Sequence, residues 1–339
     1  MMETPEGRIT FSFISPVYNE QDGLEAFYRR LTDAAESIGE PYEIIFVNDG
    51  STDETPSILH RLASDDIRVR VVEFSRNFGH QAAVTAGYDY ACGRAVISLD
   101  ADGQHPPEMI PQLVARWREG FEVVYTVRRD TKGISRIRRG LGRLMYRVIR
   151  ASSGVELTDQ ADFRLLDRRA VDALKSVREQ ARFVRGLVNW IGFRQVAVPY
   201  TAQERMAGKS NYTLRQLMGM SGAGTFNYSV RPLRIAPYLG AIMLAAAICY
   251  AVASLALWPF GLAPGGLSHL AMGLVALFGL QLLALGIIGE YVGRIFTEAK
   301  DRPLYVVRET CGFPKPADEQ AALEKRTDRQ GEERFSVFT

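Results

Sequence analysis

The sequence predicts an α/β domain with a mainly parallel sheet and helices on both of its faces, followed by a hairpin of two membrane-spanning helices. Two observations lead to this fold class. Short runs rich in Val, Ile and Phe alternate with longer helical runs as far as residue 127, which is the pattern of consecutive βα units. Two long apolar runs follow in the last third of the chain, and 339 residues are enough for both parts.

Each expected strand is short, and each expected helix lies between two strands. The strands are Ile9–Ser15, Tyr42–Asn48, Val69–Phe74, Ala95–Leu99 and Glu122–Val127. The helices are Glu20–Ile38, Asp53–Ala63, His80–Ala91 and Pro107–Glu119. Ligands of such sheets bind outside the carboxyl ends of the strands, so the loops that follow the strands form the candidate site.

The loops after the first four strands are rich in polar and charged residues. One such loop alone is explained as a turn or as the cap of the next helix. Four of them at one edge of a sheet indicate a binding site instead. No Gly-x-Gly-x-x-Gly follows the first strand and there is no Walker loop, so neither a common dinucleotide site nor a P-loop is expected. The loops are Ser15–Glu20, Asn48–Asp53, Ser75–His80 and Asp100–Glu108.

Two carboxylates, Asp100 and Asp102, lie two residues apart directly after the fourth strand. Mg²⁺ prefers one or two carboxylates together with phosphate oxygens of a substrate, and Gln104 offers a further oxygen ligand. A cation at this position would neutralise the charge that builds on a departing diphosphate. The pattern therefore predicts a divalent metal site at this strand end.

Residues of about 235–258 and 267–290 form two apolar runs that carry no charge before Glu290. Each run is long enough as a helix to cross a hydrocarbon core of ~30 Å. The alternative is a buried helical hairpin in a soluble core. Arg and Lys residues flank the outer ends of both runs, which predicts that both termini lie in the cytoplasm.

The composition agrees with a large first part that stays in the cytoplasm. Residues 1–8 are polar and the apolar run after them is short, so no secretory signal is expected. The three cysteines are widely spaced and fit neither a disulfide framework nor a zinc site, which indicates a reducing compartment. The 41 basic and 39 acidic side chains nearly balance, so a nucleic-acid partner is not expected.

Residues 128–150 are strongly basic, because their nine Lys and Arg side chains are opposed only by Asp130. Apolar residues occur among them at helical spacing, which predicts a basic amphipathic helix of about 135–151 lying on a membrane surface. A solvated charged face and a nucleic-acid-binding face are the alternatives. Some of these arginines could equally bind a lipid phosphate, and the candidates are Arg128, Arg138 and Arg139.

Seven short motifs occur in a characteristic order: Ser-Pro-Val-Tyr-Asn-Glu (15–20), Val-Asn-Asp-Gly-Ser-Thr-Asp (47–53), Arg-Asn-Phe-Gly-His-Gln (76–81), Asp-Ala-Asp-Gly-Gln-His-Pro-Pro-Glu (100–108), Asp-Phe-Arg-Leu (162–165), Glu-Arg-Met-Ala-Gly-Lys-Ser (204–210) and Gly-Glu-Tyr-Val-Gly-Arg (289–294). With these motifs the chain resembles the family 2 glycosyltransferases over nearly its whole length. Within that family it is most similar to the polyprenyl-phosphate hexose synthases, which include dolichol-phosphate mannose synthase and the bactoprenol glucosyltransferases.

The resemblance implies a cytoplasmic GT-A catalytic domain of residues 1–230, a transmembrane hairpin of residues 231–298 and a cytoplasmic C-terminal segment of residues 299–339. The implied reaction is the inverting transfer of a hexose, first of all from UDP-glucose, to undecaprenyl phosphate at the cytoplasmic face of the inner membrane. UDP-galactose, UDP-N-acetylglucosamine, GDP-mannose and UDP-aminoarabinose stay open as donors. A homo-oligomer, such as a tetramer, is also implied.

The resemblance further assigns roles to single residues, and Mg²⁺ or Mn²⁺ is the implied cofactor. The residues implied for the nucleotide sugar are Pro16, Tyr18 and Glu20 in the nucleotide pocket, Asp49 at the base, and Asp100 at the ribose or sugar. The residues implied for catalysis are Asp100 again, Asp102 with Gln104 at the metal, Asp162 near the reacting centre, and Arg205 and Lys209 over the diphosphate. Many relatives have a second Asp where this chain has Asn48, so the base contact depends on Asp49 alone.

Three other functions are weighed against this one. A processive polysaccharide synthase would carry Gln-x-x-Arg-Trp and more membrane helices, whereas here Arg116-Trp117 follows Gln112 at the wrong spacing. A nucleotidyltransferase would show a glycine-rich loop after the first strand, where this chain has Ser15–Glu20. A non-catalytic membrane scaffold would have no use for the intact pair of Asp100 and Asp102.

Overall fold

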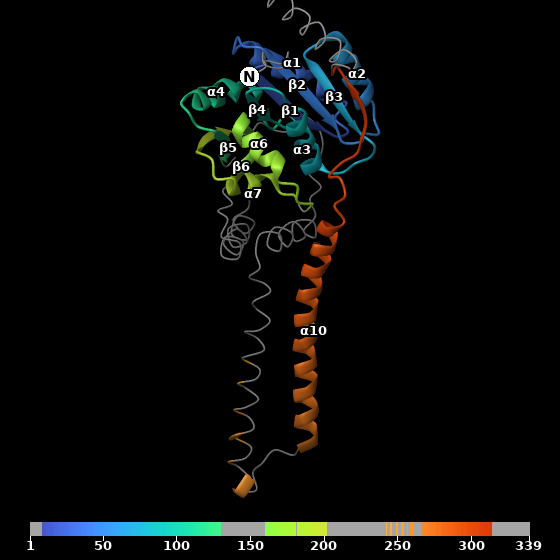
Figure 1. Ribbon diagram of the computed structural model, residues 1–339, viewed down its shortest axis with the longest axis vertical. Helices are drawn as coiled ribbons and strands as arrows, with labels where there is room; N and C mark the ends of the chain where they lie inside the picture. Colours follow the sequence, from blue (N-terminus) through green and yellow to red (C-terminus); the bar gives the residue numbers. More distant parts are fainter. Residues whose placement is uncertain are drawn as a thin grey trace, which may run out of the picture.

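The computed structural model describes residues 9–129, 160–180, 182–201 and 266–313, together with isolated positions between 242 and 260. The described strands form one eight-stranded mixed sheet with the order β7-β5-β6-β4-β1-β2-β3-β8 (Figure 1). The strands are β1 Phe11–Val17, β2 Tyr42–Asn48, β3 Val69–Phe74, β4 Ala95–Ser98, β5 Val123–Arg129, β6 Gln160–Asp167, β7 Gln195–Thr201 and β8 Val307–Cys311.

Helices cover both faces of the sheet because its central strands bury apolar side chains on both sides. On one face Phe11 and Phe13 pack with α1, α2 and α4, and on the other face Ile14 and Ile45 pack with α3, α6 and α7. The helices on the first face are α1 Leu24–Glu36, α2 Thr55–Asp65 and α4 Ile110–Arg118. Those on the second face are α3 His80–Tyr90, α6 Arg168–Ser176 and α7 Val184–Trp190.

The predicted α/β class with a mainly parallel centre is confirmed. β1 lies between β2 and β4 and runs parallel to both, and β3 runs parallel to β2. All five predicted strands and four predicted helices are present, with small shifts at their ends. α1 begins at Leu24 instead of Glu20, because residues 20–23 form a turn closed by Gly23 N–H and Glu20 C=O at 3.1 Å. The predicted helix from residue 107 divides into a 3₁₀ turn, Pro107–Met109, and α4.

Three strands were not predicted, and two of them run antiparallel. β6 lies between β4 and β5 and antiparallel to both, with Arg164 opposite Ser98. β8 runs antiparallel to β3, and β7 runs parallel to β5 at the other edge of the sheet. Because Arg164 pairs with the last residue of β4, Asp162 is carried beyond the carboxyl end of that strand, toward Asp100. The antiparallel insertion of β6 thus adds residues to the predicted site.

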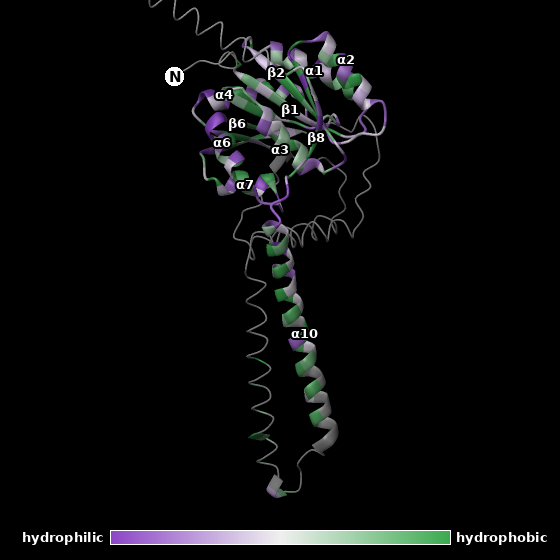
Figure 2. Cartoon of the chain, turned by 45° about the vertical axis from the view of Figure 1, so that its right-hand side comes forward, coloured by the Kyte–Doolittle hydropathy of each residue, from purple (hydrophilic) through white to green (hydrophobic). Residues whose placement is uncertain are grey.

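A 34-residue helix, α10 (Gly266–Ala299), extends away from the domain (Figure 1) and carries mainly apolar residues (Figure 2). Within the described part of the chain it is the one helix long and apolar enough to cross a membrane, over Leu277–Ala299, and none of that stretch is buried. The first apolar run lies mostly outside the described residues, although the described positions at its centre, such as Ile242 and Val252, are helical. The two-helix hairpin therefore stays a prediction.

Candidate active site

The loops after β1 and β2 are joined into one surface by hydrogen bonds between them. Asn19 N–H donates to Ser51 Oγ at 3.0 Å, and Thr52 N–H donates to Asn19 Oδ1 at 2.8 Å. Glu20 N–H donates to the Thr55 hydroxyl at 3.0 Å. Tyr18 lies on this surface with 46% of its area exposed. The predicted nucleotide residues of the first loop are thus held against the second loop, as a shared pocket requires.

Asp49 is a buried carboxylate that holds the loop between β3 and α3. Its Oδ1 accepts from the Phe78 amide at 2.6 Å, and its Oδ2 accepts from the Gly79 amide at 3.0 Å. Burial raises the pKa of Asp49 above its ordinary value, and these two amides only partly offset that effect. Asp49 therefore has a structural role at this edge in addition to its predicted contact with the base.

Gly50 is required because the backbone of the next loop passes directly over it. It has a φ of +69°, and a Cβ added here would lie 2.5 Å from the carbonyl carbon of Arg76. We expect Gly50→Ala to lower the stability of the protein by ~1–3 kcal/mol and to weaken nucleotide binding, because the loop held by Asp49 must move. Thermal unfolding and UDP titration calorimetry measure the two effects.

Gly39→Ala is the matched control for this substitution. Gly39 has a similar φ of +74°, but nothing lies within 4 Å of the position of an added Cβ. It should show only the backbone cost of a left-handed residue, ~1–2 kcal/mol, with unchanged UDP affinity. Equal UDP affinities of the two variants would contradict the assigned role of Gly50.

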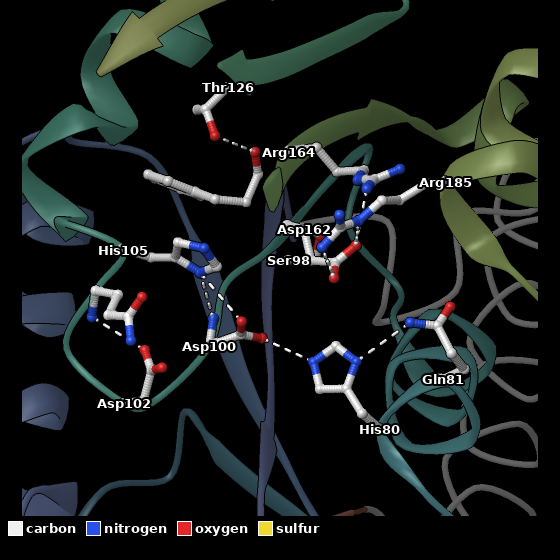
Figure 3. Close-up of polar contacts among 12 residues, drawn as sticks. His80, Gln81, Ser98, Asp100, Asp102, His105, Thr126, Asp162, Arg164 and Arg185 are labelled. Atoms are coloured by element: carbon white, nitrogen blue, oxygen red, sulfur yellow. Dashed lines mark hydrogen bonds and ion pairs between the residues drawn. The ribbon is translucent and has the colours of Figure 1, made fainter. Parts of the chain in front are cut away.

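Asp100 lies between two histidines at the carboxyl end of β4 (Figure 3). Its Oδ1 is 2.9 Å from His80 Nε2 and its Oδ2 is 3.6 Å from His105 Nδ1. Burial disfavours charge on both members of the His80–Asp100 pair, but their mutual attraction outweighs it. The pKa of His80 is raised and the pKa of Asp100 is lowered, so both shifts favour a charged pair with a fixed carboxylate.

Asp102 lies in the loop after β4, and its Oδ1 accepts from the backbone N–H of Gln104 at 3.0 Å. Within the described ranges, no group of three or more His, Cys, Asp or Glu side chains is arranged to hold a metal ion. The oxygen donors at this strand end suit Mg²⁺ or Mn²⁺, provided that phosphate oxygens of a substrate supply the remaining ligands. The donor set therefore fits a metal that binds together with a diphosphate.

Asp162 forms ion pairs with two arginines (Figure 3). Arg185 on α7 donates through Nε to Oδ1 at 2.9 Å and through Nη2 to Oδ2 at 2.7 Å, and Arg164 Nη2 donates to Oδ1 at 2.9 Å. Burial alone would raise the pKa of Asp162, but the two guanidinium groups outweigh it and hold that pKa well below its ordinary range. A carboxylate in this state is a weak proton acceptor.

The described structure brings most predicted site residues to one edge of the sheet, and the remaining predicted residues lie elsewhere or outside the described part of the chain. Pro16 lies near the carboxyl end of β1, Asp162 lies at the facing end of β6, and the loops after β1, β2 and β4 carry Tyr18, Glu20, Asp49, Asp100, Asp102 and Gln104. Arg128 lies in β5 opposite Tyr200 of β7. Outside the described residues lie Arg138, Arg139, Arg205 and Lys209.

Four residues of this edge were not predicted as site residues, and one of them, His105, lies in the predicted loop Asp100–Glu108. His80 follows the third strand, so the rule that strand ends carry the site already pointed to its loop. Arg164 and Arg185 reach Asp162 from β6 and α7, two elements that were not predicted. No spacing in the sequence indicates that Arg164 and Arg185 contact the same carboxylate.

Comparison with known proteins identifies the chain. The model of the family "Glycosyl transferase family 2" matches residues 12–174, which contain all the described site residues except Arg185. An uncharacterized glycosyltransferase of Bacillus subtilis, YkcC, is 42% identical over 307 residues, which cover 90% of this chain and 95% of the relative. The chain belongs to glycosyltransferase family 2.

Other relatives of this glycosyltransferase have more specific names. A prophage bactoprenol glucosyl transferase homolog of Escherichia coli is 34% identical over 299 residues, covering 88% of this chain and 98% of the relative. The bactoprenol glucosyl transferase of Shigella phage SfII is 34% identical over 301 residues, covering 88% and 97%.

Solved structures resemble this glycosyltransferase more distantly. A glucosyl-3-phosphoglycerate synthase from Mycobacterium tuberculosis, in complex with Mn²⁺, UDP-glucose and phosphoglyceric acid, gives a TM-score of 0.45 at 21% identity. That match covers 64% of this chain and 77% of the synthase. A mannosyl-3-phosphoglycerate synthase from Rubrobacter xylanophilus gives 0.47 at 19% identity, covering 68% and 75%.

Proposed function

We propose that this glycosyltransferase transfers a hexose, first of all from UDP-glucose, to a polyprenyl phosphate such as undecaprenyl phosphate at the cytoplasmic face of the membrane. The observation that carries the proposal is the 34% identity, over 88% of the chain, to relatives named bactoprenol glucosyl transferase. The apolar helix α10 supports a lipid acceptor, because it would hold the catalytic sheet at a membrane.

The donor would bind at the edge formed by the loops after β1, β2 and β4. The joined loops of Tyr18 and Ser51 suit a nucleoside, and the buried Asp49 lies behind them. Asp102 and Gln104 would hold Mg²⁺ or Mn²⁺ near the diphosphate, with Asp100 fixed toward the sugar by His80. The bound metal would supply neutralisation of the charge on the leaving diphosphate. Arg205 and Lys209 are proposed to cover that diphosphate.

The acceptor would need little activation by the protein. A phosphate monoester has a second pKa near 6 and is largely dianionic at neutral pH, so it is already a nucleophile. The lowered pKa of Asp162 supports a role in orientation and argues against an obligate general base. We infer a single in-line displacement that inverts the anomeric carbon, with Arg128, Arg138 and Arg139 as candidates for holding the acceptor phosphate.

The short connection between α10 and the sheet supports the proposed arrangement in the cell. α10 ends at Ala299 and β8 begins eight residues later, so the β3 edge of the catalytic sheet stays close to the end of the helix. We propose the two-helix hairpin of about residues 235–258 and 267–290, both termini in the cytoplasm, the interfacial helix of about residues 135–151, and a homo-oligomer.

The full chain in lipid nanodiscs, supplied with Mg²⁺ or Mn²⁺ and undecaprenyl phosphate, tests the proposal. Each of the five nucleotide sugars is offered in turn, and both nucleotide release and the lipid-linked sugar are measured. UDP-glucose should give the highest rate and a β-linked product from the α-linked donor, and omission of the lipid phosphate should leave only background release. Failure of every donor would contradict the proposed reaction, and an α-linked product would contradict the single displacement.

A further inference from the structure

The last turn of α10 and the residues after it are attached to the catalytic domain. We call residues 298–313 the juxtamembrane segment. At its start, both carboxylate oxygens of Glu298 accept from the backbone N–H of Gln180, at 2.8 and 3.0 Å. At its end, β8 pairs with β3 over four residues, from Val71 opposite Cys311 to Phe74 opposite Val307. The segment is therefore part of the catalytic domain and not a free linker.

Tyr305, in the middle of this segment, is held by its ring and by its hydroxyl. Its ring stacks on Phe74, with ring centres 4.9 Å apart and planes 14° from parallel. Its hydroxyl donates to Asp89 Oδ2 at 2.8 Å, and Arg178 binds both oxygens of the same carboxylate at 2.8 and 2.9 Å. Tyr305 thus joins the last residue of β3 to α3, the two elements on either side of the loop 75–79.

The contacts of Tyr305 continue into that loop. Phe74 packs edge-on against Phe78, with ring centres 5.7 Å apart. The neighbouring Val306 accepts from the Ser75 amide at 2.9 Å, and Arg308 donates to the Ser75 carbonyl at 3.0 Å. The juxtamembrane segment therefore fixes the first residue of the loop through the backbone and Phe78 through a row of aromatic rings.

The far side of the same loop faces the candidate site. The amide of Phe78 and the amide of Gly79 hold the buried carboxylate of Asp49, and His80, the next residue, holds Asp100 at 2.9 Å. The loop 75–79 is thus the connection between the membrane end of the chain and two carboxylates proposed to contact the donor.

We propose that Tyr305 is a positioning residue for the donor site. Tyr305 holds the loop 75–79 from outside through Phe74 and Phe78, the loop in turn fixes Asp49, and His80 directly after the loop fixes Asp100. The role of these carboxylates rests on the proposed function, whereas the control of the loop by Tyr305 does not. Because its contacts are with Phe74 and Asp89, outside the loop, Tyr305 acts on donor binding and leaves the chemical step unchanged.

Tyr305→Ala in the full chain tests this inference. Hydrogen–deuterium exchange of peptides covering residues 75–80 should become about tenfold faster, because the ring contact and the bond to Asp89 are both lost. The KM for the nucleotide sugar should rise about five- to tenfold while kcat stays within about twofold. Tyr305→Phe keeps the stack on Phe74 and should restore exchange and KM to within about threefold of the original protein.

Tyr28→Ala is the matched control. Tyr28 on α1 is also half-buried, and its hydroxyl also donates to a carboxylate, that of Asp66, at 2.7 Å, but α1 covers the opposite face of the sheet. It should lower the melting temperature without changing exchange in residues 75–80 or the donor KM.

Two failures can be told apart in this experiment. If exchange in residues 75–80 were the same in Tyr305→Ala and Tyr28→Ala, the inference would be wrong whatever the substrate is. If the original protein transferred sugar from no donor, the proposed function would be wrong, and the exchange result would still decide whether Tyr305 controls the loop. Faster exchange with an unchanged donor KM would also overturn the inference, because the loop would then not position the donor.

Discussion

Asp102→Asn is expected to lower the rate of sugar transfer by about 100- to 1,000-fold while the protein keeps its fold. The Asn side chain has the shape of the Asp carboxylate. Its oxygen can still accept the hydrogen bond that the backbone N–H of Gln104 donates to Asp102 Oδ1 at 3.0 Å. It lacks the negative charge with which Asp102 would hold Mg²⁺ or Mn²⁺ against a diphosphate. The loss should therefore appear in the chemical step and in the metal requirement, and not in stability.

Initial rates of UDP release at a series of Mg²⁺ and Mn²⁺ concentrations measure this effect. Asp167→Asn is the matched control, because Asp167 Oδ1 accepts from the Arg169 amide two residues later in the same way, at 3.0 Å. Asp167 lies opposite Ala95, at the other end of β4 from the site. Its variant should keep full activity. Full activity of Asp102→Asn at low metal concentration would refute the metal assignment.

Asp162→Asn is expected to destabilise the protein by ~3–5 kcal/mol, which corresponds to a fall in melting temperature of roughly 6–20 °C. The carboxylate compensates the charge of Arg164, whose side chain is 1% exposed, and that of Arg185. Without it, the buried guanidinium of Arg164 keeps its charge but loses the carboxylate of this ion pair, and removing one partner of a buried ion pair is costly.

The pH dependence gives this prediction a second measurement. The pKa of Asp162 is lowered in the folded protein, so its stabilising effect is fully present above the unfolded value of about 3.9 and is lost as the pH falls through the folded value. The difference in melting temperature between the original protein and Asp162→Asn should therefore be largest near neutral pH and shrink below about pH 4.

Asp172→Asn provides the comparison for a surface ion pair. Asp172 pairs with Arg168 at 3.6 Å and is 60% exposed, so its loss should cost less than about 1 kcal/mol. A melting temperature of Asp162→Asn as high as that of Asp172→Asn would show that the buried pair contributes nothing beyond a surface pair.

The central strands could be predicted because both of their faces are buried. β2, Tyr42–Asn48, is buried at every position, so its sequence is an almost continuous apolar run. β6 escaped prediction because Asp162, Arg164 and Asp167 interrupt its apolar pattern, and the structure buries the first two only by pairing their charges. β8 is short and mostly polar, and only its pairing with β3 makes it a strand.

The candidate site was likewise predicted in part: its local motifs could be recognised, and its long-range contacts could not. Asp100 and Asp102 could be predicted from local sequence, because a carboxylate pair that follows a buried strand lies at a sheet edge. The partnership of Asp100 with His80, and of Asp162 with Arg185, joins side chains 20 and 23 residues apart in the chain. Such contacts depend on how α3 and α7 pack against the sheet, and no local pattern encodes that packing.

The position of β8 also imposes an order on synthesis. Translation proceeds from the N-terminus, so the ribosome makes α10 before it makes the strand that completes the β3 edge of the sheet. Until Val307–Cys311 has emerged, that edge has no partner from β8, and Phe74 lacks the ring of Tyr305. The nascent enzyme therefore acquires the final contacts of the loop 75–79 only after the long apolar helix α10 has been produced.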